Sequence, residues 1–236
     1  MSEENLDGNG FKEIIFGDEG GNLNVYSSAG FSQFGYPFES GDKIRSSPAV
    51  ADLDMDGILE VVFGSYDGKL YVLSPFGSIL SESQYPGDIV GSPALIDLDQ
   101  DGDKEVVFTT QIGNSGSLYA IHHNGEPFQG FPVNIDEKML AGPAAGDLES
   151  DGSPDIVIVT WDDNIYAVDN TGNITVSKQT VSFDMGFGPM DIDVEGNGII
   201  DTSNSGTMNL TYSFEIETIP GFPISESLEC SIILSR

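Results

Sequence analysis

The chain alternates short hydrophobic runs with short polar segments, and no run has the period of an amphipathic helix. One set of runs is rich in β-branched and aromatic residues, which is typical of buried strands. Its members are EIIFG at 13–17, EVVFG at 60–64, EVVFT at 105–109 and DIVIV at 155–159. A second set follows, with KLYVLS at 69–74, SLYAIH at 117–122 and NIYAVD at 164–169. The pattern predicts an all-β protein.

Turn residues separate these runs. YDGK at 66–69 and WDDN at 161–164 lie between the first and second sets, and an Asp-Gly pair favours a tight type I′ hairpin. A second turn follows each run of the second set, such as PFGS at 75–78 or HNGE at 123–126. A weaker, polar run comes after this turn. An apolar run also precedes each unit, after a Gly or Ser and a Pro. Each unit is therefore expected to contain four short antiparallel strands.

One acidic segment recurs along the chain at intervals of 45 to 50 residues. It reads NLDGNGFKE from 5, DLDMDGILE from 52, DLDQDGDKE from 97, DLESDGSPD from 147 and DVEGNGIID from 193. Four strands in about 46 residues is the size of one β-propeller blade. We therefore expect a single five-bladed propeller domain over residues 1–236, with repeats near 5–46, 47–90, 91–140, 141–186 and 187–236.

The ends of the chain suggest how the ring closes. The first acidic segment lacks the apolar strand that should precede it, and the chain ends in the apolar run ECSIILSR at 229–236. We expect this C-terminal strand to pair with the N-terminal blade as its innermost strand. The alternative is an excerpt from a longer propeller.

The net charge is extreme, since 39 acids against 8 Lys and Arg residues give −31. A phosphate backbone would be repelled, so nucleic acid is not an expected partner. No run of 18 apolar residues is present, so membrane insertion is not expected either. The N-terminal residues have no secretory pattern, so either the protein is intracellular or its export signal lies outside this chain.

The acidic segment has the composition of a calcium loop, because calcium takes six to eight oxygen ligands. Side chains at positions 1, 3 and 5 converge, Gly at position 6 permits the turn, position 7 offers its carbonyl and an acid at position 9 completes the shell. The sequence predicts up to five structural Ca²⁺ sites. Their candidate ligands are Asn5, Asp7, Asn9, Phe11 and Glu13; Asp52, Asp54, Asp56, Ile58 and Glu60; Asp97, Asp99, Asp101, Asp103 and Glu105; Asp147, Glu149, Asp151, Ser153 and Asp155; and Asp193, Glu195, Asn197, Ile199 and Asp201.

Other readings of this segment explain less. An EF-hand needs a Glu at position 12 between two helices, whereas position 12 here is Phe63 in the second loop, inside a predicted strand. Solvated Asp-Gly turns are common between strands, but they leave the carboxylates of each loop crowded without a cation. Magnesium is the lesser candidate, because it demands strict octahedral geometry.

The whole pattern resembles the FG-GAP repeat, also called the VCBS-type repeat. The Phe-Gly half is similar to Phe16-Gly17 and Phe63-Gly64, and the Gly-Ala-Pro half to Gly91-Ser92-Pro93. This repeat builds the propeller of integrin α-subunits and of many secreted bacterial proteins. The resemblance implies a calcium-loaded propeller with each ion between the first and second strands of a blade. The asparagines of the first loop and the later Thr-Thr and Val-Thr steps depart from the pattern.

No catalytic constellation stands out. His122 and His123 are adjacent, and adjacent strand residues point to opposite faces, so they read as a turn-flanking pair rather than a shared site. We therefore expect a non-catalytic, calcium-stabilised, monomeric interaction module of a larger exported protein, extracellular, at the cell surface or in the periplasm. It would bind protein or glycan on the face away from the metal loops. The alternative is a propeller-type lectin or carbohydrate-active enzyme.

Overall fold

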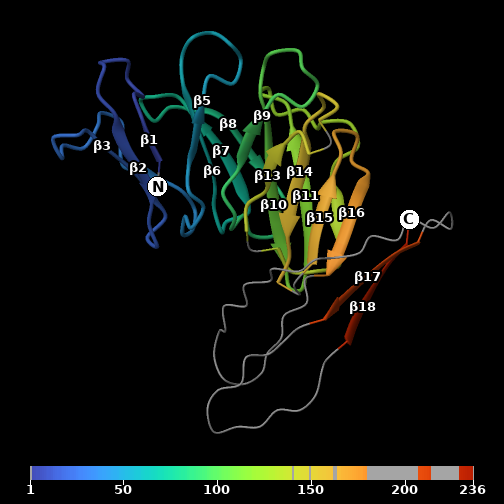
Figure 1. The fold of residues 1–236 in the computed structure, drawn as a ribbon. Coiled ribbons are helices and arrows are strands. Elements are labelled where there is room, and N and C mark those ends of the chain that lie inside the picture. Colours follow the sequence, from blue (N-terminus) through green and yellow to red (C-terminus); the bar gives the residue numbers. More distant parts are fainter. Residues whose placement is uncertain are drawn as a thin grey trace, which may run out of the picture. The chain divides into compact units, whose positions relative to one another are not determined.

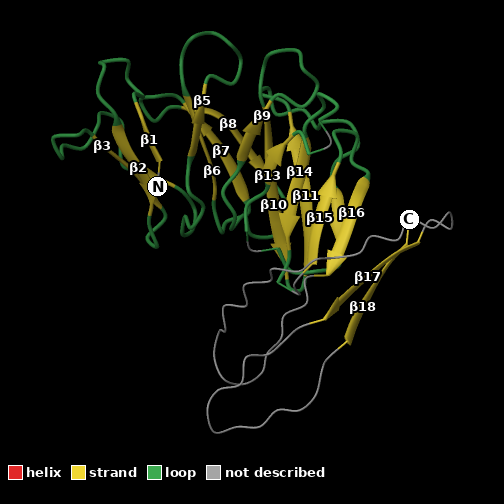
Figure 2. Cartoon of the chain, viewed as in Figure 1, coloured by secondary structure: helices red, strands yellow, loops and turns green. Residues whose placement is uncertain are grey.

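The computed structural model describes residues 2–139, 141–148, 150–161, 164–179, 207–213 and 229–235 (Figure 1). All regular elements of these residues are strands, as the sequence predicts (Figure 2). No helix that could cross a membrane is found in this part of the chain. The chain divides into two compact units, Met1–Ser182 and Phe183–Arg236.

The first unit contains four sheets, each of four antiparallel strands in chain order. The first sheet contains β1 (Ser2–Glu4), β2 (Glu13–Gly17), β3 (Asn22–Tyr26) and β4 (Phe38–Glu39). The second contains β5 (Ala49–Ala51), β6 (Glu60–Gly64), β7 (Lys69–Leu73) and β8 (Ile79–Gln84). The third contains β9 (Ala94–Ile96), β10 (Glu105–Ile112), β11 (Ser115–Ile121) and β12 (Val133–Ile135). The fourth contains β13 (Ala144–Gly146), β14 (Asp155–Val159), β15 (Asn164–Val168) and β16 (Ile174–Gln179). The predicted repeats 47–90, 91–140 and 141–186 therefore each supply one four-stranded sheet. The repeat 5–46 supplies three strands, and Ser2–Glu4 before it supplies the fourth.

The four sheets stand side by side in sequence order (Figure 1). Their first strands contact one another in turn, β1 with β5, β5 with β9 and β9 with β13. This arrangement of successive four-stranded sheets around their first strands is that of propeller blades.

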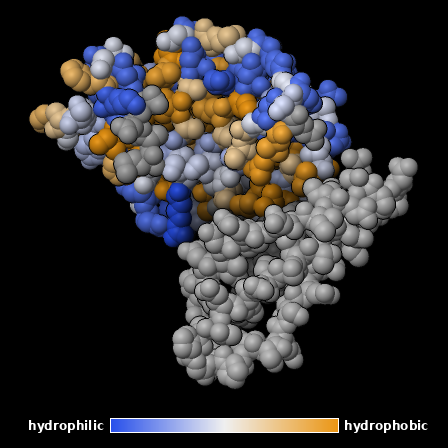
Figure 3. Space-filling model, in the orientation of Figure 1, coloured by the Kyte–Doolittle hydropathy of each residue, from blue (hydrophilic) through white to orange (hydrophobic). Residues whose placement is uncertain are grey.

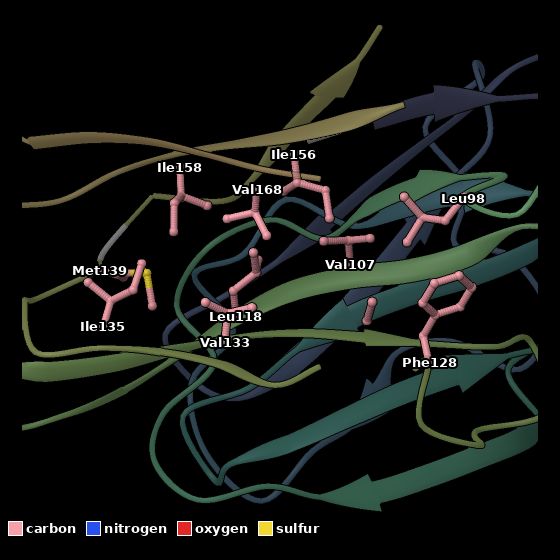
Figure 4. Close-up of a cluster of buried hydrophobic side chains, with 11 residues drawn as sticks. Leu98, Val107, Leu118, Phe128, Val133, Ile135, Met139, Ile156, Ile158 and Val168 are labelled. Atoms are coloured by element: carbon pink, nitrogen blue, oxygen red, sulfur yellow. The ribbon is translucent and has the colours of Figure 1, made fainter. Parts of the chain in front are cut away.

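The core lies between neighbouring sheets. Alternate residues of β6 point to opposite faces: Val61 and Phe63 pack with the first sheet, and Val62 packs with the third. Both faces of β6 are covered, which explains why its sequence is hydrophobic without alternation. Figure 4 shows the equivalent packing between the third and fourth sheets.

The same aromatic pair recurs in adjacent sheets. Phe63 stacks on its cross-strand partner Tyr71 with ring centroids 5.0 Å apart, and Phe108 stacks on Tyr119 at 5.3 Å. In each case a third ring lies edge-on to the phenylalanine. Phe38 lies edge-on to Phe63, and Tyr85 lies edge-on to Phe108. Equivalent positions of the repeat therefore carry equivalent packing.

The predicted ring closure is not confirmed. β1, the polar segment Ser2–Glu4, pairs with β2 as the first strand of the first sheet, the position that the sequence assigned to the C-terminal run. In the second unit β17 (Thr207–Ser213) pairs antiparallel with β18 (Glu229–Ser235). A fifth blade and a single domain over 1–236 stay predictions.

The hairpin type predicted for the Asp-Gly turn is wrong. A type I′ turn needs positive φ at both central residues, whereas in this turn only Gly68 has it, at 79°. The Gly68 amide donates to the Ser65 carbonyl, and the Ser65 amide donates to Lys69. This is a type I turn followed by a left-handed glycine, the usual three-residue hairpin.

Candidate metal centres in the acidic loops

In the first unit the acidic loops connect the first and second strands of each sheet, and they share one conformation. The side chain at position 1 accepts a hydrogen bond from the amide of the glycine at position 6. The donor and acceptor pairs are Gly10 to Asn5 (3.1 Å), Gly57 to Asp52 (2.9 Å), Gly102 to Asp97 (3.1 Å) and Gly152 to Asp147 (2.9 Å). Position 5 likewise accepts from the amide of position 7, as in Ile58 to Asp56 at 2.7 Å.

The backbone turns twice through the left-handed region. The glycine at position 6 has positive φ, for example 88° at Gly57, as the sequence predicts. Position 4 is also left-handed, with φ of 61° at Met55, 63° at Gln100 and 58° at Ser150. These residue types give no sequence signal for this conformation, and only the glycines at position 4 of the first and fifth loops, Gly8 and Gly196, hint at it.

The acid at position 9 is the first residue of the second strand, and it is buried. Its carboxylate accepts a hydrogen bond from the backbone amide of position 2, seven residues earlier. The pairs are Leu6 with Glu13 (2.9 Å), Leu53 with Glu60 (2.9 Å), Leu98 with Glu105 (2.7 Å) and Leu148 with Asp155 (3.0 Å). This bond fastens the start of the loop to the start of the following strand.

Several carboxylate oxygens in the loops lack a partner. Among the described residues, the buried side-chain oxygens without a hydrogen bond are Glu13 Oε1, Asp52 Oδ1, Asp97 Oδ1 and Asp103 Oδ1. All four belong to predicted ligand residues. A buried polar oxygen without a partner is costly, so these atoms are suited to a cation.

The second and third loops bring three candidate oxygens together. Ligand atoms of Asp52, Asp54 and Glu60 lie within 4.8 Å of one another, as do those of Asp97, Asp99 and Asp101. Two oxygens on opposite sides of one calcium ion, each at about 2.4 Å, lie about 4.8 Å apart. The donor set and its spacing therefore fit calcium.

Burial also changes the protonation of these acids. It raises the pKa of Glu60, and the charge of Asp54 adds to the rise against the opposing bond from Leu53. Burial raises the pKa of Glu105 in the same way. Both groups are thus held where their charged form is disfavoured, and a cation would relieve this.

The predicted ligands of the first, fourth and fifth loops are described to different extents. Glu149 and the fifth-loop ligands Asp193, Glu195, Asn197, Ile199 and Asp201 lie outside the described residues. In the first loop Asp7 is engaged by Asn9 and Gln33 side chains, at 2.9 and 3.1 Å. Asp147 and Asp151 keep the loop conformation of the other repeats.

The interpretation of the two histidines as a pair on opposite faces is wrong. His122 Nδ1 lies 3.0 Å from Glu105 Oε1, and His123 Nδ1 lies 2.6 Å from Asp103 Oδ2. Strand β11 ends at Ile121, so strand alternation does not apply to the residues beyond it. Both imidazoles instead reach the same acidic loop.

Neighbouring loops also contact one another through position 4. The Met55 sulfur lies against Gly102, where an added Cβ would be 2.9 Å from it. The Gln100 side chain donates to the carbonyl oxygen of Gly152. The second, third and fourth loops therefore form a connected series.

Comparison with solved structures supports the propeller fold. The chain is similar to BBS1N in complex with ARL6DN, with a TM-score of 0.57 and 12% identity over 96% of this chain and 64% of that one. It is also similar to the C-terminal domain of Pseudomonas aeruginosa PilY1, with a TM-score of 0.54 and 14% identity over 86% and 52%. For BamB from Moraxella catarrhalis the TM-score is 0.51, with 19% identity over 90% and 62%. The chain thus spans about half to two thirds of the length of these proteins.

Sequence comparison identifies the family. No curated protein sequence matches the chain significantly. A model of the FG-GAP-like repeat matches residues 5–63 and 97–158, more than half of the chain. Both matched segments begin at an acidic loop and end within the second strand of the next sheet. The chain therefore belongs to the FG-GAP-like repeat family.

Proposed function

We propose that this chain is a non-catalytic interaction module, stabilised by calcium, that works outside the cytoplasm as part of a larger exported protein. The observation that carries the calcium assignment is the set of buried carboxylate oxygens without a partner, all in predicted ligand residues. A bound ion would supply the positive charge that lets these acids ionise together.

The proposed location follows from the chemistry of such loops. Calcium modules that work outside cells bind at about 10⁻⁴–10⁻³ M, a concentration that the cytosol does not supply. The large excess of acids over bases is in keeping with a saline or extracellular setting.

The proposed docking surface is at the end of the sheets opposite the acidic loops. This end carries the hairpins between second and third strands and the connections between sheets. There the Lys43 Nζ lies 4.2 Å from the Tyr66 ring centroid, and the Lys138 Nζ lies 5.4 Å from that of Trp161. Tyrosine and tryptophan are residue types enriched at the energetic centres of protein interfaces.

The two pairs are equivalent in the repeat. The Tyr66 amide donates to the Lys43 carbonyl at 3.1 Å, and the Trp161 amide donates to the Lys138 carbonyl at 2.8 Å. Trp161 is 67% exposed, so one face of this end presents a large ring to solvent. Figure 3 shows hydrophobic residues exposed among hydrophilic ones on the side in view.

A protein partner is the first candidate. The similar BBS1N structure holds a second protein, ARL6DN, which supports a propeller of this fold as a docking platform. A glycan is the second candidate, making the chain a lectin, and the exposed Trp161 indole favours it because sugars stack on aromatic rings.

The test uses biotinylated full chain in Ca²⁺ buffer, on extracts containing surface proteins and on a panel of polysaccharides. We expect a retained partner that Trp161→Ala weakens at least about 10-fold and that EDTA releases. Phe76→Ala is the matched control, since Phe76 is an exposed aromatic at the loop end of the second sheet. Equal retention by the two variants would exclude this surface, and hydrolysis of a polysaccharide would exclude a non-catalytic role.

Binding to this surface also has a direct spectroscopic signal. Trp161 is the single tryptophan of the chain, so its emission reports on this end of the molecule alone. A partner that docks there should shift the emission to shorter wavelength and reduce quenching by acrylamide. Unchanged emission at saturation would place the partner elsewhere.

A further inference from the structure

The third loop differs from the other three loops of the first unit because an imidazole contacts its position-9 acid. His122 Nδ1 lies 3.0 Å from Glu105 Oε1, and Glu105 is fully buried. The residue at each equivalent position begins the turn after the third strand, with its amide bonded to a carbonyl four residues later. In the other sheets of the first unit these residues are Ser27, Ser74 and Asp169.

Three candidate metal ligands in the third loop and the turn after β11 lie close together. One atom each of Asp99, Glu105 and His122 lies within 4.8 Å of the others. Two ligands bonded to one tetrahedral ion at about 2.0–2.1 Å lie about 3.3 Å apart. The observed separation between His122 Nδ1 and Glu105 Oε1 is close to that value.

The neighbouring residues orient the Glu105 carboxylate and leave other loop carboxylate oxygens without a partner. The other Glu105 oxygen accepts the Leu98 amide at 2.7 Å, which orients the carboxylate. In the same loop Asp97 Oδ1 and Asp103 Oδ1 are buried without partners. An ion bound here would face one nitrogen and several oxygens.

We propose that the third loop binds a transition-metal ion of the Zn²⁺ type through Asp99, Glu105 and His122, in preference to calcium. Calcium is a hard ion that selects oxygen ligands, whereas imidazole suits zinc and its neighbours in the first transition row. The second loop brings Asp52, Asp54 and Glu60 together. His123 lines the pocket beside Asp54 and Glu60 but is not part of that group of ligand atoms, so the second loop is the internal comparison. This inference rests on the proposed use of the loops as metal sites and assigns the third one a different ion.

The test uses Co²⁺ as a spectroscopic substitute for zinc. Metal-free full chain is placed in millimolar Ca²⁺ and titrated with CoCl₂, followed by visible absorption, and with ZnCl₂, followed by calorimetry. We expect one equivalent of Co²⁺ or Zn²⁺ to bind in the presence of calcium. His122→Ala should weaken that binding at least about 100-fold, since even the indirect partners of metal ligands contribute about 10–100-fold. His123→Ala removes the partner of Asp103, which is not one of the three proposed ligands, so it should weaken the binding clearly less than His122→Ala does.

The outcomes separate this inference from the calcium proposal. If calcium raises the melting temperature of wild type and His122→Ala alike, and no cobalt binding depends on His122, the transition-metal site is wrong and the calcium proposal stands. If cobalt binding depends on His122 while calcium leaves the melting temperature unchanged, the calcium proposal is wrong and this one stands.

A measurement on the unmodified chain covers the case in which His122→Ala fails to fold. Zinc binding should shift the ¹⁵N resonance of one imidazole nitrogen by tens of parts per million, saturating at one equivalent. Unchanged imidazole resonances would overturn the proposal.

Discussion

The Glu60 carboxylate accepts a 2.9 Å hydrogen bond from the backbone amide of Leu53, seven residues earlier in the chain. Leu53 is itself buried in the core between the second and third sheets. One bond thus joins the acidic loop, the start of β6 and the apolar core. It recurs in all four sheets of the first unit.

Removal of this bond should destabilise the protein. Glu60→Ala leaves the Leu53 amide buried without its acceptor, which costs about 1–3 kcal/mol, measured by urea unfolding in EDTA. The control is Glu82→Ala, because Glu82 pairs with Lys69 at the surface and such pairs contribute about 0–1 kcal/mol. Equal losses in the two variants would contradict the role given to Glu60.

Calcium should raise the thermal stability of the chain. An ion at a hundredfold excess over its Kd stabilises by about 2.7 kcal/mol per site, so melting in calcium should occur several degrees above melting in EDTA. Magnesium at the same concentration should have a smaller effect. A melting curve that EDTA leaves unchanged would exclude structural calcium.

The metal-free protein should lose stability as the pH rises. The pKa values of Glu60 and Glu105 lie above their ordinary value of 4.5 in the folded state, mainly because of burial. Above pH 4.5 the folded chain therefore holds more protons on these groups than the unfolded chain. Their contribution is fully present below that pH and is lost as the pH rises through the folded pKa values.

Urea unfolding in EDTA across pH 4.5 to 7 measures this dependence. Glu60→Gln keeps an acceptor for the Leu53 amide but cannot ionise, so the pH slope should become shallower. The general repulsion among the remaining acids stays the same in both proteins. If Glu60→Gln leaves the pH dependence of the unfolding free energy unchanged, Glu60 does not contribute to it.

A close backbone contact between the first two sheets should not tolerate a side chain. Gly35 has φ of 88°, and a Cβ added there would lie 1.9 Å from the Phe76 carbonyl oxygen. Gly30 has a similar φ of 81° with nothing within 4 Å, so Gly30→Ala is the control. Its left-handed backbone costs about 1–2 kcal/mol, and Gly35→Ala should cost clearly more in urea unfolding. An equal loss of unfolding free energy in the two variants would mean that the turn at Gly35 and the turn at Phe76 separate easily.

Much of the fold could be predicted from local patterns. The runs at 60–64 and 69–74 become β6 and β7 because their alternate residues enter two different cores. The positive φ of the glycine at position 6 was also predictable in the four loops of the first unit, because glycine adopts that conformation without strain. The recurrence of the acidic loop at intervals of 45 to 50 residues indicated repeated four-stranded units, which one loop alone would not.

Other features depend on contacts in the folded structure that the local sequence does not indicate. Met55, Gln100 and Ser150 adopt left-handed backbone that their residue types do not indicate, because the loop imposes it. The approach of His122 to Glu105 depends on where β11 ends. The polar segment Ser2–Glu4 gave no strand signal, yet it pairs with β2 through its backbone.

The contacts between neighbouring loops have a direction. Met55 reaches forward to the third loop and Gln100 reaches forward to the fourth, whereas Gly8, at the same position of the first loop, has no side chain to reach the second. Loosening the fourth loop would deprive the third of a support, and loosening the third would deprive the second. Disorder begun at the first loop would stop there. The first loop should therefore loosen without its neighbours, while its sheet stays attached to the second through the shared core that contains Val61 and Phe63.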